Sequence, residues 1–316
     1  MPSEVEGTFE IGETSLYTKT WKVCTTSKPS PPSNTPQADD APVAKLIFVH
    51  GFNDHIGRYY DLFPTLAARG ISVYAFDQRG WGRSVRSNAD RGKTGPTAQV
   101  ISDTAKFIEA QLPSDIPVFV LGHSMGGGQV LTLASEPQYE DIIKQVDGWL
   151  LESPFIAFPK GLEPNSLEVF AGTLASRLLP NMSRFSALPV ENTTRDPEVI
   201  KSLNEDKLLH GYGTLQGLAH MIQRTKLLGE GTSKISPSVK CLWLGHGTAD
   251  KGTSYEASKG WFEKQGEKPD WTFKSYEGWS HQLHADLPET RAVFAKDIGD
   301  WILERAGEAK SGQSKL

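Results

Sequence analysis

The sequence predicts an α/β fold in which a mostly parallel, doubly wound sheet carries a helical insertion. Short continuous apolar runs, typical of strands covered on both faces, occupy residues 45–49, 71–76, 118–121 and 148–151. Segments with helical periodicity lie between or just after them, at residues 59–69, 98–112 and 126–135. Strand–helix alternation at this spacing predicts parallel strands joined by right-handed crossovers.

The alternation stops between residues 153 and 236, where we expect helices but no clear strand. Apolar runs return at 239–244 and 271–276, and a closing helix is expected at 293–305. Near the start, residues 14–24 alternate as a half-buried strand does, and a loop rich in proline and serine follows. We therefore expect core parts at 1–152 and 237–305, a helical cap at 153–236 and a flexible tail at 306–316.

Composition excludes several classes of protein. The 316 residues carry a formal net charge of −5 and no basic stripe, which argues against nucleic-acid binding. The cysteines, Cys24 and Cys241, form no disulfide framework, and Cys241 lies in an apolar run typical of a buried strand. No secretory pattern and no apolar run of about 20 residues occurs, so we expect a cytoplasmic protein. Dinucleotide and P-loop motifs are missing, so no cofactor or metal is expected.

The strongest chemical signal is the G-x-S-x-G motif at residues 122–126, with Ser124 at its centre. An apolar strand precedes it and a helical segment follows, which is the context that the motif requires. Glycines on both sides of the serine allow a sharp turn, which places the hydroxyl at the carboxyl end of the sheet. We therefore predict that Ser124 is a nucleophile, with the following helix directing its N–H groups at a developing oxyanion.

A serine hydroxyl needs a base, and in this arrangement the acid and then the histidine follow the serine along the chain. His281 follows an apolar strand and a tight turn, so we prefer it as the base over His284, three residues later. Asp250 lies on a glycine-rich loop after the preceding strand and is the predicted orienting acid. His246 is interpreted as a loop residue bonded to backbone, and His210 and His220 as surface or cap residues.

The oxyanion requires a second donor, for which the loop after the first core strand is the candidate. The predicted donors are the backbone N–H groups of Phe52 and Met125. Residues 77–84 end the second parallel strand with glycines and charges. We interpret them as a structural loop with no catalytic part.

Together these residues resemble the monoacylglycerol lipase family of α/β-hydrolases, and its fungal members in particular. The resemblance runs from about residue 43 to residue 302, through F-V-H-G, D-Q-R-G, L-G-H-S-M-G-G-G, G-T-A-D and Y-E-G-W-S-H. It implies hydrolysis of monoglycerides to glycerol and fatty acid, without a metal or cofactor. Attachment to membranes or lipid droplets is also implied. Two features depart from the mammalian members: bulky Phe52 stands where a small residue is usual, and Lys251 and Gly252 follow the acid where the mammalian enzyme has a cysteine.

The cap is consistent with a lipid substrate. A broad apolar face is predicted on its first helix, formed by Leu167, Val169, Phe170, Leu174, Leu178 and Leu179. This face either packs on protein or meets acyl chains or a membrane surface, so Leu167, Phe170, Leu174 and Leu178 are candidate substrate contacts.

We expect a monomer or weak dimer. The fold alone leaves three rivals open: a lysophospholipase or other esterase, a proline-type aminopeptidase, and a non-catalytic lipid-binding protein.

Overall fold

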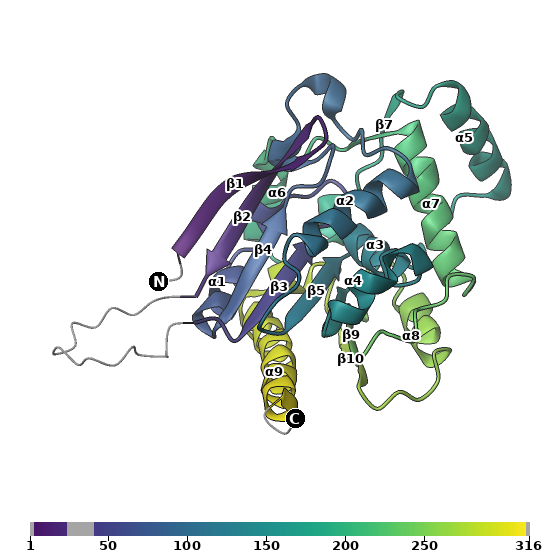
Figure 1. Ribbon diagram of the computed structural model, residues 1–316. Coiled ribbons are helices and arrows are strands. Elements are labelled where there is room, and N and C mark those ends of the chain that lie inside the picture. Colours follow the sequence, from purple (N-terminus) through teal and green to yellow (C-terminus); the bar gives the residue numbers. More distant parts are fainter. Residues whose placement is uncertain (1–2, 24–40, 314–316) are drawn as a thin grey trace.

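The computed structural model describes residues 3–23 and 41–313, and an eight-stranded sheet runs through it in the order β1-β2-β4-β3-β5-β6-β9-β10 (Figure 1). The neighbouring strands from β4 to β10 are all parallel. They are β4 (Ile71–Phe76), β3 (Ala44–Val49), β5 (Val118–His123), β6 (Gly148–Glu152), β9 (Leu242–Gly247) and β10 (Trp271–Tyr276). The parallel, doubly wound sheet expected from the sequence is therefore confirmed.

An antiparallel hairpin extends one end of the sheet. It consists of β1 (Ser3–Ile11) and β2 (Thr14–Lys22), and β2 also pairs antiparallel with β4. Sequence reasoning predicted β2 but missed β1, because β1 is an edge strand whose side chains are almost all exposed and show no buried face. Cys24 lies outside the described residues, and so does the loop expected after it, except for residues 41 and 42.

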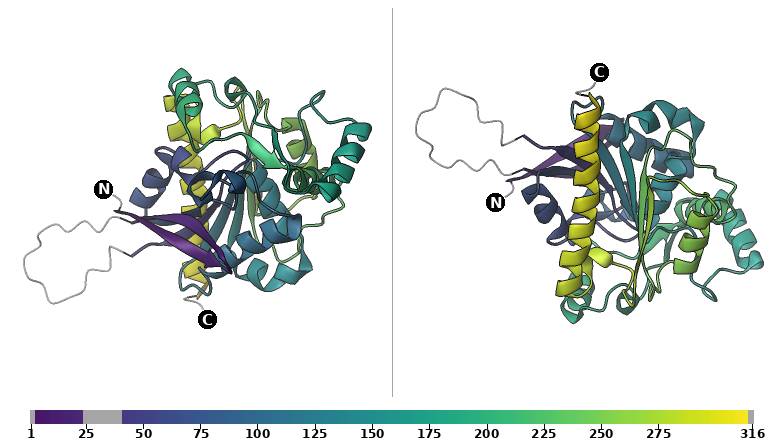
Figure 2. Two further views of the ribbon diagram at one scale, coloured as in Figure 1. Left: turned by 90° about the horizontal axis from the view of Figure 1, so that it is seen from above. Right: turned by 90° about the horizontal axis from the view of Figure 1, so that it is seen from below.

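Helices cover both faces of the sheet, and each face has its own apolar core. On one side lie α1 (Leu62–Ala68) and α9 (Pro288–Gln313), the long yellow helix that crosses the sheet in Figure 2. On the other side lie α2 (Thr97–Glu109), α3 (Met125–Leu133), α4 (Glu140–Gln145) and α8 (Tyr255–Glu263). Along β3 the side chains alternate: Leu46 and Phe48 join the first core, Ile47 and Val49 the second. This double burial explains the continuous apolar runs in the sequence.

The cap lies between β6 and β9 and contains α5 (Ser166–Leu178), α6 (Pro197–Glu205) and α7 (Leu215–Gly229). Helices α5 and α7 pack together at the end of the molecule away from the β1–β2 hairpin (Figures 1 and 2). The expectation that this segment has no strand is wrong. β7 (Ser183–Phe185) pairs antiparallel with β8 (Tyr212–Thr214). At this length a strand shows no usable alternation in the sequence.

Two boundaries near the end of the chain differ from expectation. Helix α9 continues to residue 313, so residues 306–313 are helical where a flexible tail was expected. Ala306 explains this extension, since its side chain is buried in the core beneath the helix. β9 begins at Leu242, three residues later than expected. Cys241 therefore lies just before the strand, buried, with its thiol donating to the carbonyl oxygen of Asp147.

Helix α9 offers a direct test of how strongly it is anchored to the sheet. Phe294 is fully buried against Trp243 and Tyr276, whereas its neighbour Val293 is 45% exposed. We expect Phe294→Ala to lower the free energy of unfolding by about 3–5 kcal/mol, because it removes a buried ring and leaves a cavity. Val293→Ala is the matched control and should cost less than about 1 kcal/mol. Equal losses in urea unfolding would contradict this packing.

Candidate active site

Ser124, Asp250, His281 and Phe52 lie at one edge of the sheet, where the parallel strands end. Ser124 follows β5, Asp250 and His281 follow β9 and β10, and Phe52 follows β3. Because carboxyl ends of parallel strands meet at the same edge, these separated segments converge. A methyl group added at Gly51, beside Phe52, would lie 3.2 Å from the Cβ of Ser124, so the loop after β3 reaches the predicted nucleophile.

Ser124 has a backbone conformation that side-chain-bearing residues seldom adopt. Its φ is 54° and its ψ −119°, between the end of β5 and the start of α3. Main-chain hydrogen bonds hold it there: its N–H donates to Glu152, and its carbonyl accepts from Phe155. Gly122 and Gly126 are required because any side chain would overlap neighbouring backbone. This backbone conformation is that of the sharp strand-to-helix turn which the sequence predicts at Ser124, and the direction of the hydroxyl stays a prediction.

Asp250 and His281 are in direct contact. His281 Nδ1 lies 2.8 Å from Asp250 Oδ2, and the carboxylate is fully buried. Burial alone would raise the pKa of Asp250, but the neighbouring histidines, chiefly His281, hold it well below its usual range. Burial alone would lower the pKa of His281, and the carboxylate reverses this and raises it. The contact fixes the proton on Nδ1 and leaves Nε2 as the basic nitrogen.

Sequence reasoning misjudged His246, which contacts the acid and not the backbone. It is buried on β9, and its Nε2 lies 2.9 Å from Asp250 Oδ2, the oxygen that also faces His281. The hydroxyl of Thr253 donates to the same oxygen at 2.9 Å. The other oxygen accepts N–H bonds from Gly252 and Thr253. The sequence contained a signal for this contact. His246 precedes Asp250 by four residues, and a tight turn between them brings the two side chains together.

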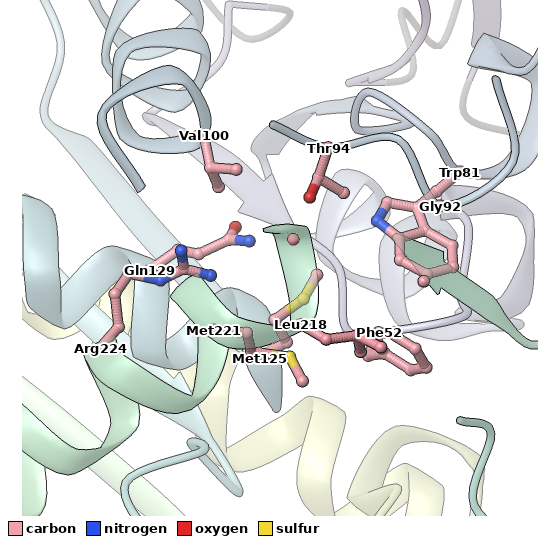
Figure 3. A pocket seen from close by; sticks show the side chains of 12 residues that line it. Phe52, Trp81, Gly92, Thr94, Val100, Met125, Gln129, Leu218, Met221 and Arg224 are labelled. Carbon is pink, nitrogen blue, oxygen red and sulfur yellow. The ribbon is translucent and has the colours of Figure 1, made fainter. Parts of the chain in front are cut away.

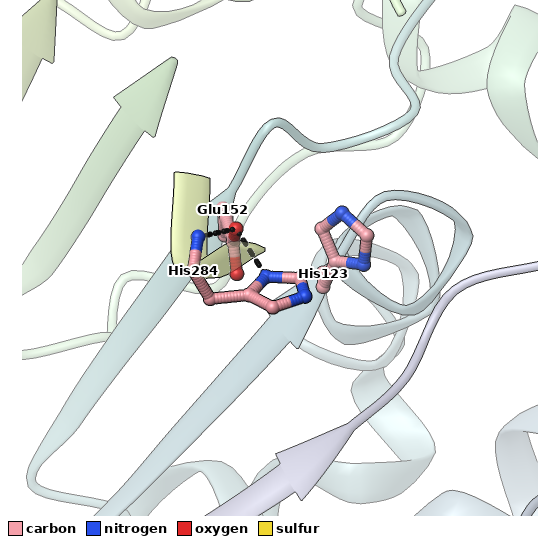
Figure 4. A group of neighbouring side chains, drawn as sticks. All are labelled: His123, Glu152 and His284. Atoms are coloured by element: carbon pink, nitrogen blue, oxygen red, sulfur yellow. Dashed lines mark hydrogen bonds and ion pairs between the residues drawn. The ribbon is translucent and has the colours of Figure 1, made fainter. Parts of the chain in front are cut away.

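A second buried cluster consists of His123, the residue before Ser124, together with Glu152 and His284 (Figure 4). Glu152 Oε1 accepts from Nδ1 of His284 at 2.6 Å and from its backbone N–H. His123 Nδ1 faces the hydroxyl of Tyr59, which donates to buried Asp54. The ligand atoms of the cluster lie within 4.8 Å of one another, a spacing that a metal ion could use. The hydrogen bonds engage His284 with Glu152, so His284 supports the site and does not contact Asp250.

The loop after β3 is held from the side by the segment at 77–84. Gln78 donates its backbone N–H to the ring of His50 and its amide to the carbonyl of His50. Asp77 accepts N–H bonds from Ile56 and Arg83. Residues 77–84 therefore have the structural role that we expected. They hold the main chain of the loop after β3, which contains Phe52.

The remaining candidates make no hydrogen bond, ion pair or ring contact with Ser124, Asp250 or His281 within the described residues. His210 stacks on Trp81 and contacts the carbonyl of Gly80, and His220 contacts Thr97 from α7. The candidate substrate contacts lie on α5, each at least 49% exposed: Leu167, Phe170, Leu174 and Leu178. These four side chains are not buried in the described protein, although α5 itself packs on α7, so their contact with lipid stays a prediction.

A small cavity borders the predicted oxyanion donors. Phe52 and Met125 line it together with Trp81, Gln129, Met221 and Arg224 (Figure 3). Bulky Phe52 packs edge-on against Trp81, with ring centroids 4.7 Å apart. The bulky side chain at position 52, where a small residue was expected, therefore packs on the ring of Trp81 in the cavity wall.

A strained serine between strand and helix, with a buried histidine–aspartate pair at the same edge, defines a serine hydrolase of the α/β-hydrolase fold. Residues 40–288 match the family described as serine aminopeptidase, S33. A Schizosaccharomyces pombe protein assigned as a monoglyceride lipase is 32% identical over 95% of this chain and 74% of its own length. The Rattus norvegicus monoglyceride lipase is 30% identical over 93% of this chain and 88% of its own.

The fold is likewise similar to that of a solved structure, a soluble variant of Saccharomyces cerevisiae monoglyceride lipase in complex with a substrate analogue. The two superimpose with a TM-score of 0.80 at 19% identity, covering 96% of this chain and 97% of the other. The chain therefore belongs to the monoglyceride lipase family of α/β-hydrolases.

Removing the charge of Asp250 and removing its contact with His246 should shift the pKa of His281 in opposite directions. Removing the carboxylate charge with Asp250→Asn should lower the pKa of His281 and move the acidic limb of kcat/KM to lower pH, with about 10⁴-fold loss of rate. His246→Leu removes a donor that competes for the carboxylate, so the pKa of His281 should rise and the limb should move to higher pH. His246→Gln is the matched control because it keeps a donor.

These shifts are measured as kcat/KM against pH with a water-soluble ester. Identical profiles for the wild type and His246→Leu would contradict a role for His246 in setting the basicity of His281.

Proposed function

We propose that the protein hydrolyses monoacylglycerols to glycerol and free fatty acid through an acyl-enzyme on Ser124. The observation that carries the proposal is the buried Asp250–His281 contact at the same sheet edge as the strained serine. The fold and family membership support this reaction class, and the names of the relatives support the substrate.

In the proposed first step, His281 Nε2 takes the hydroxyl proton of Ser124 as the oxygen attacks the ester carbonyl. Asp250 holds the ring in the required tautomer and stabilises the imidazolium that forms. The oxyanion accepts the N–H groups of Phe52 and Met125, each worth about 3 kcal/mol in such sites. The N-terminus of α3 adds its positive dipole end.

In the second step the imidazolium protonates the departing glycerol oxygen, and the acyl group stays on Ser124. Water enters, loses a proton to His281 and attacks the same carbonyl. The bond between the acyl group and Ser124 Oγ then breaks, the serine oxygen takes the proton from His281, and the fatty acid leaves. Every proton that moves passes through His281 Nε2, so no metal or cofactor takes part in this scheme.

The cap surface supports a further proposal, that the protein associates peripherally with a membrane or lipid droplet. Large apolar side chains are exposed along it: Leu162, Leu167, Phe170, Leu174, Leu178, Leu179, Met182, Phe185 and Leu188. An apolar surface of this kind is typical of binding to lipid or protein. In the part of the chain that the structure describes, no helix has both the length and the apolar character to cross a bilayer. Cytoplasmic location and a monomeric or weakly dimeric state stay predictions from the sequence.

Ser124→Ala tests the reaction. We expect at least about a 10³-fold loss of kcat with an unchanged thermal unfolding midpoint, because the nucleophile is removed without disturbing the core. Covalent labelling by a fluorophosphonate probe should disappear with it. Retained ester hydrolysis in a clean Ser124→Ala preparation would refute the proposed nucleophile.

The substrate is tested separately by turnover of wild type across monoglycerides, lysophospholipids, di- and triglycerides and aminoacyl substrates. Monoglycerides should give the highest kcat/KM. A wild-type protein that fails to label and to turn over any ester would instead support the non-catalytic lipid-binding protein.

Membrane association is tested by placing charge on the cap surface. Leu179→Asp with Phe185→Asp should weaken sedimentation with phosphatidylcholine vesicles by roughly tenfold or more, since each buried apolar side chain contributes about 1.5–3 kcal/mol. Gln138→Asp with Gln145→Asp adds the same charge at exposed polar positions elsewhere and should leave binding unchanged. Equal vesicle binding by both double variants would contradict the assignment of this surface.

A further inference from the structure

Thr253 is hydrogen-bonded to both oxygens of the Asp250 carboxylate. Its backbone N–H donates to Oδ1 at 3.0 Å, and its hydroxyl donates to Oδ2 at 2.9 Å. The other partners in the described chain each reach one oxygen: Gly252 contacts Oδ1, whereas His246 and His281 contact Oδ2. Two donors from one residue restrict the rotation of a carboxylate about its Cβ–Cγ bond. Thr253 is therefore placed to set which oxygen faces His281.

The same hydroxyl reaches the chain segment that holds the nucleophile. Thr253 Oγ1 lies 3.0 Å from the carbonyl oxygen of Ser153, which follows β6 and has a φ of 45°. The carbonyl of the residue before it, Glu152, accepts the N–H of Ser124. Thr253 is 2% exposed, so water has little access to either hydrogen bond. The side chain therefore joins the loop of the acid to the turn of the nucleophile.

Gly252 allows the ring of His281 to pack directly on the main chain of this loop. A methyl group added at Gly252 would lie 2.9 Å from Cγ of His281, closer than two carbon atoms pack. The arrangement leaves Thr253 Oγ1 3.4 Å from His281 Nδ1, whereas Asp250 Oδ2 lies 2.8 Å from the same nitrogen. The carboxylate is thus the closer partner of the base, so an effect of the hydroxyl on the base passes through the carboxylate.

We propose that Thr253 is a positioning residue: its hydroxyl fixes the Asp250 carboxylate in the orientation that His281 needs to act as the base for Ser124. The inference rests on the ester hydrolysis proposed above and adds one residue to the three that its mechanism uses. Groups of this kind hold reacting side chains in place and tune them without touching substrate. Thr253 does not line the cavity beside Phe52 and Met125, so its loss should act on kcat and leave KM nearly unchanged.

Thr253→Val tests the hydroxyl, because it keeps the branched shape of the side chain. With a water-soluble ester we expect kcat to fall about tenfold and KM to stay within about twofold, the effect of one hydrogen bond to a charged group. Thr253→Ser restores the hydroxyl and should recover most of the rate. Thr104→Val is the matched control. It removes a hydroxyl of similar burial that bonds only within α2, so kcat should stay at the wild-type value.

A double-mutant cycle shows whether Thr253 acts through the acid. In an Asp250→Asn background, Thr253→Val should change the residual kcat by less than about twofold, because the charge that the hydroxyl orients is already gone. Equal losses in both backgrounds would overturn the inference.

Wild-type kcat in Thr253→Val would also overturn it, as would a Thr253→Ser variant that recovers no rate. Circular dichroism reports whether each variant folds, and Thr253→Ala, which also lacks the hydroxyl, replaces a valine variant that does not. All of these outcomes leave the proposed function intact. A wild-type protein that hydrolyses no ester, or a Ser124→Ala variant that still does, would instead count against the proposed function.

Discussion

The carboxylate of Asp250 is the interaction on which the edge of this sheet depends. A charge in a dry interior is stable only when donors surround it, and here they come from several directions. His246 comes from β9 itself, Gly252 and Thr253 from the loop that follows, and His281 from the loop after β10. The same contacts that neutralise the charge fix two loops relative to the strands, so orienting the base and folding this corner of the protein are one process.

A comparable arrangement surrounds two more buried carboxylates. Glu152 and Asp54 are buried carboxylates whose pKa values burial alone would raise, yet both are held below the usual range by histidines and a tyrosine. Their partners include His123, the residue before Ser124, and His284, three residues after His281. Asp54 therefore holds His123, next to the strained serine, through Tyr59. Glu152 holds His284, on the same loop as the base. Positions that are rigid before substrate arrives need no reorganisation during the reaction.

The sheet, its connections and the residues of the site were predictable because each has a local signature. Double burial gives continuous apolar runs, and the G-x-S-x-G turn needs its glycines for reasons of space alone. The contact of His246 with the acid was missed because burial of a histidine depends on what packs around it. The strand β1 and the cap strands were missed since an exposed edge and three-residue strands leave no periodic pattern.

The exposed edge strand has a consequence for how the molecule behaves in a crowded solution. Within residues 3–23 and 41–313, β1 pairs with β2 alone, so its outer edge offers backbone groups that another extended chain could join, and it carries Glu4, Glu6 and Glu10 along its length. Lys19 and Arg83 pair with Glu4 and Glu6, so part of this charge is neutralised, and the repulsion between two such edges comes chiefly from Glu10. The safeguard is electrostatic and not steric, so it weakens in acid or in high salt, and under those conditions this edge is where ordered aggregation would begin.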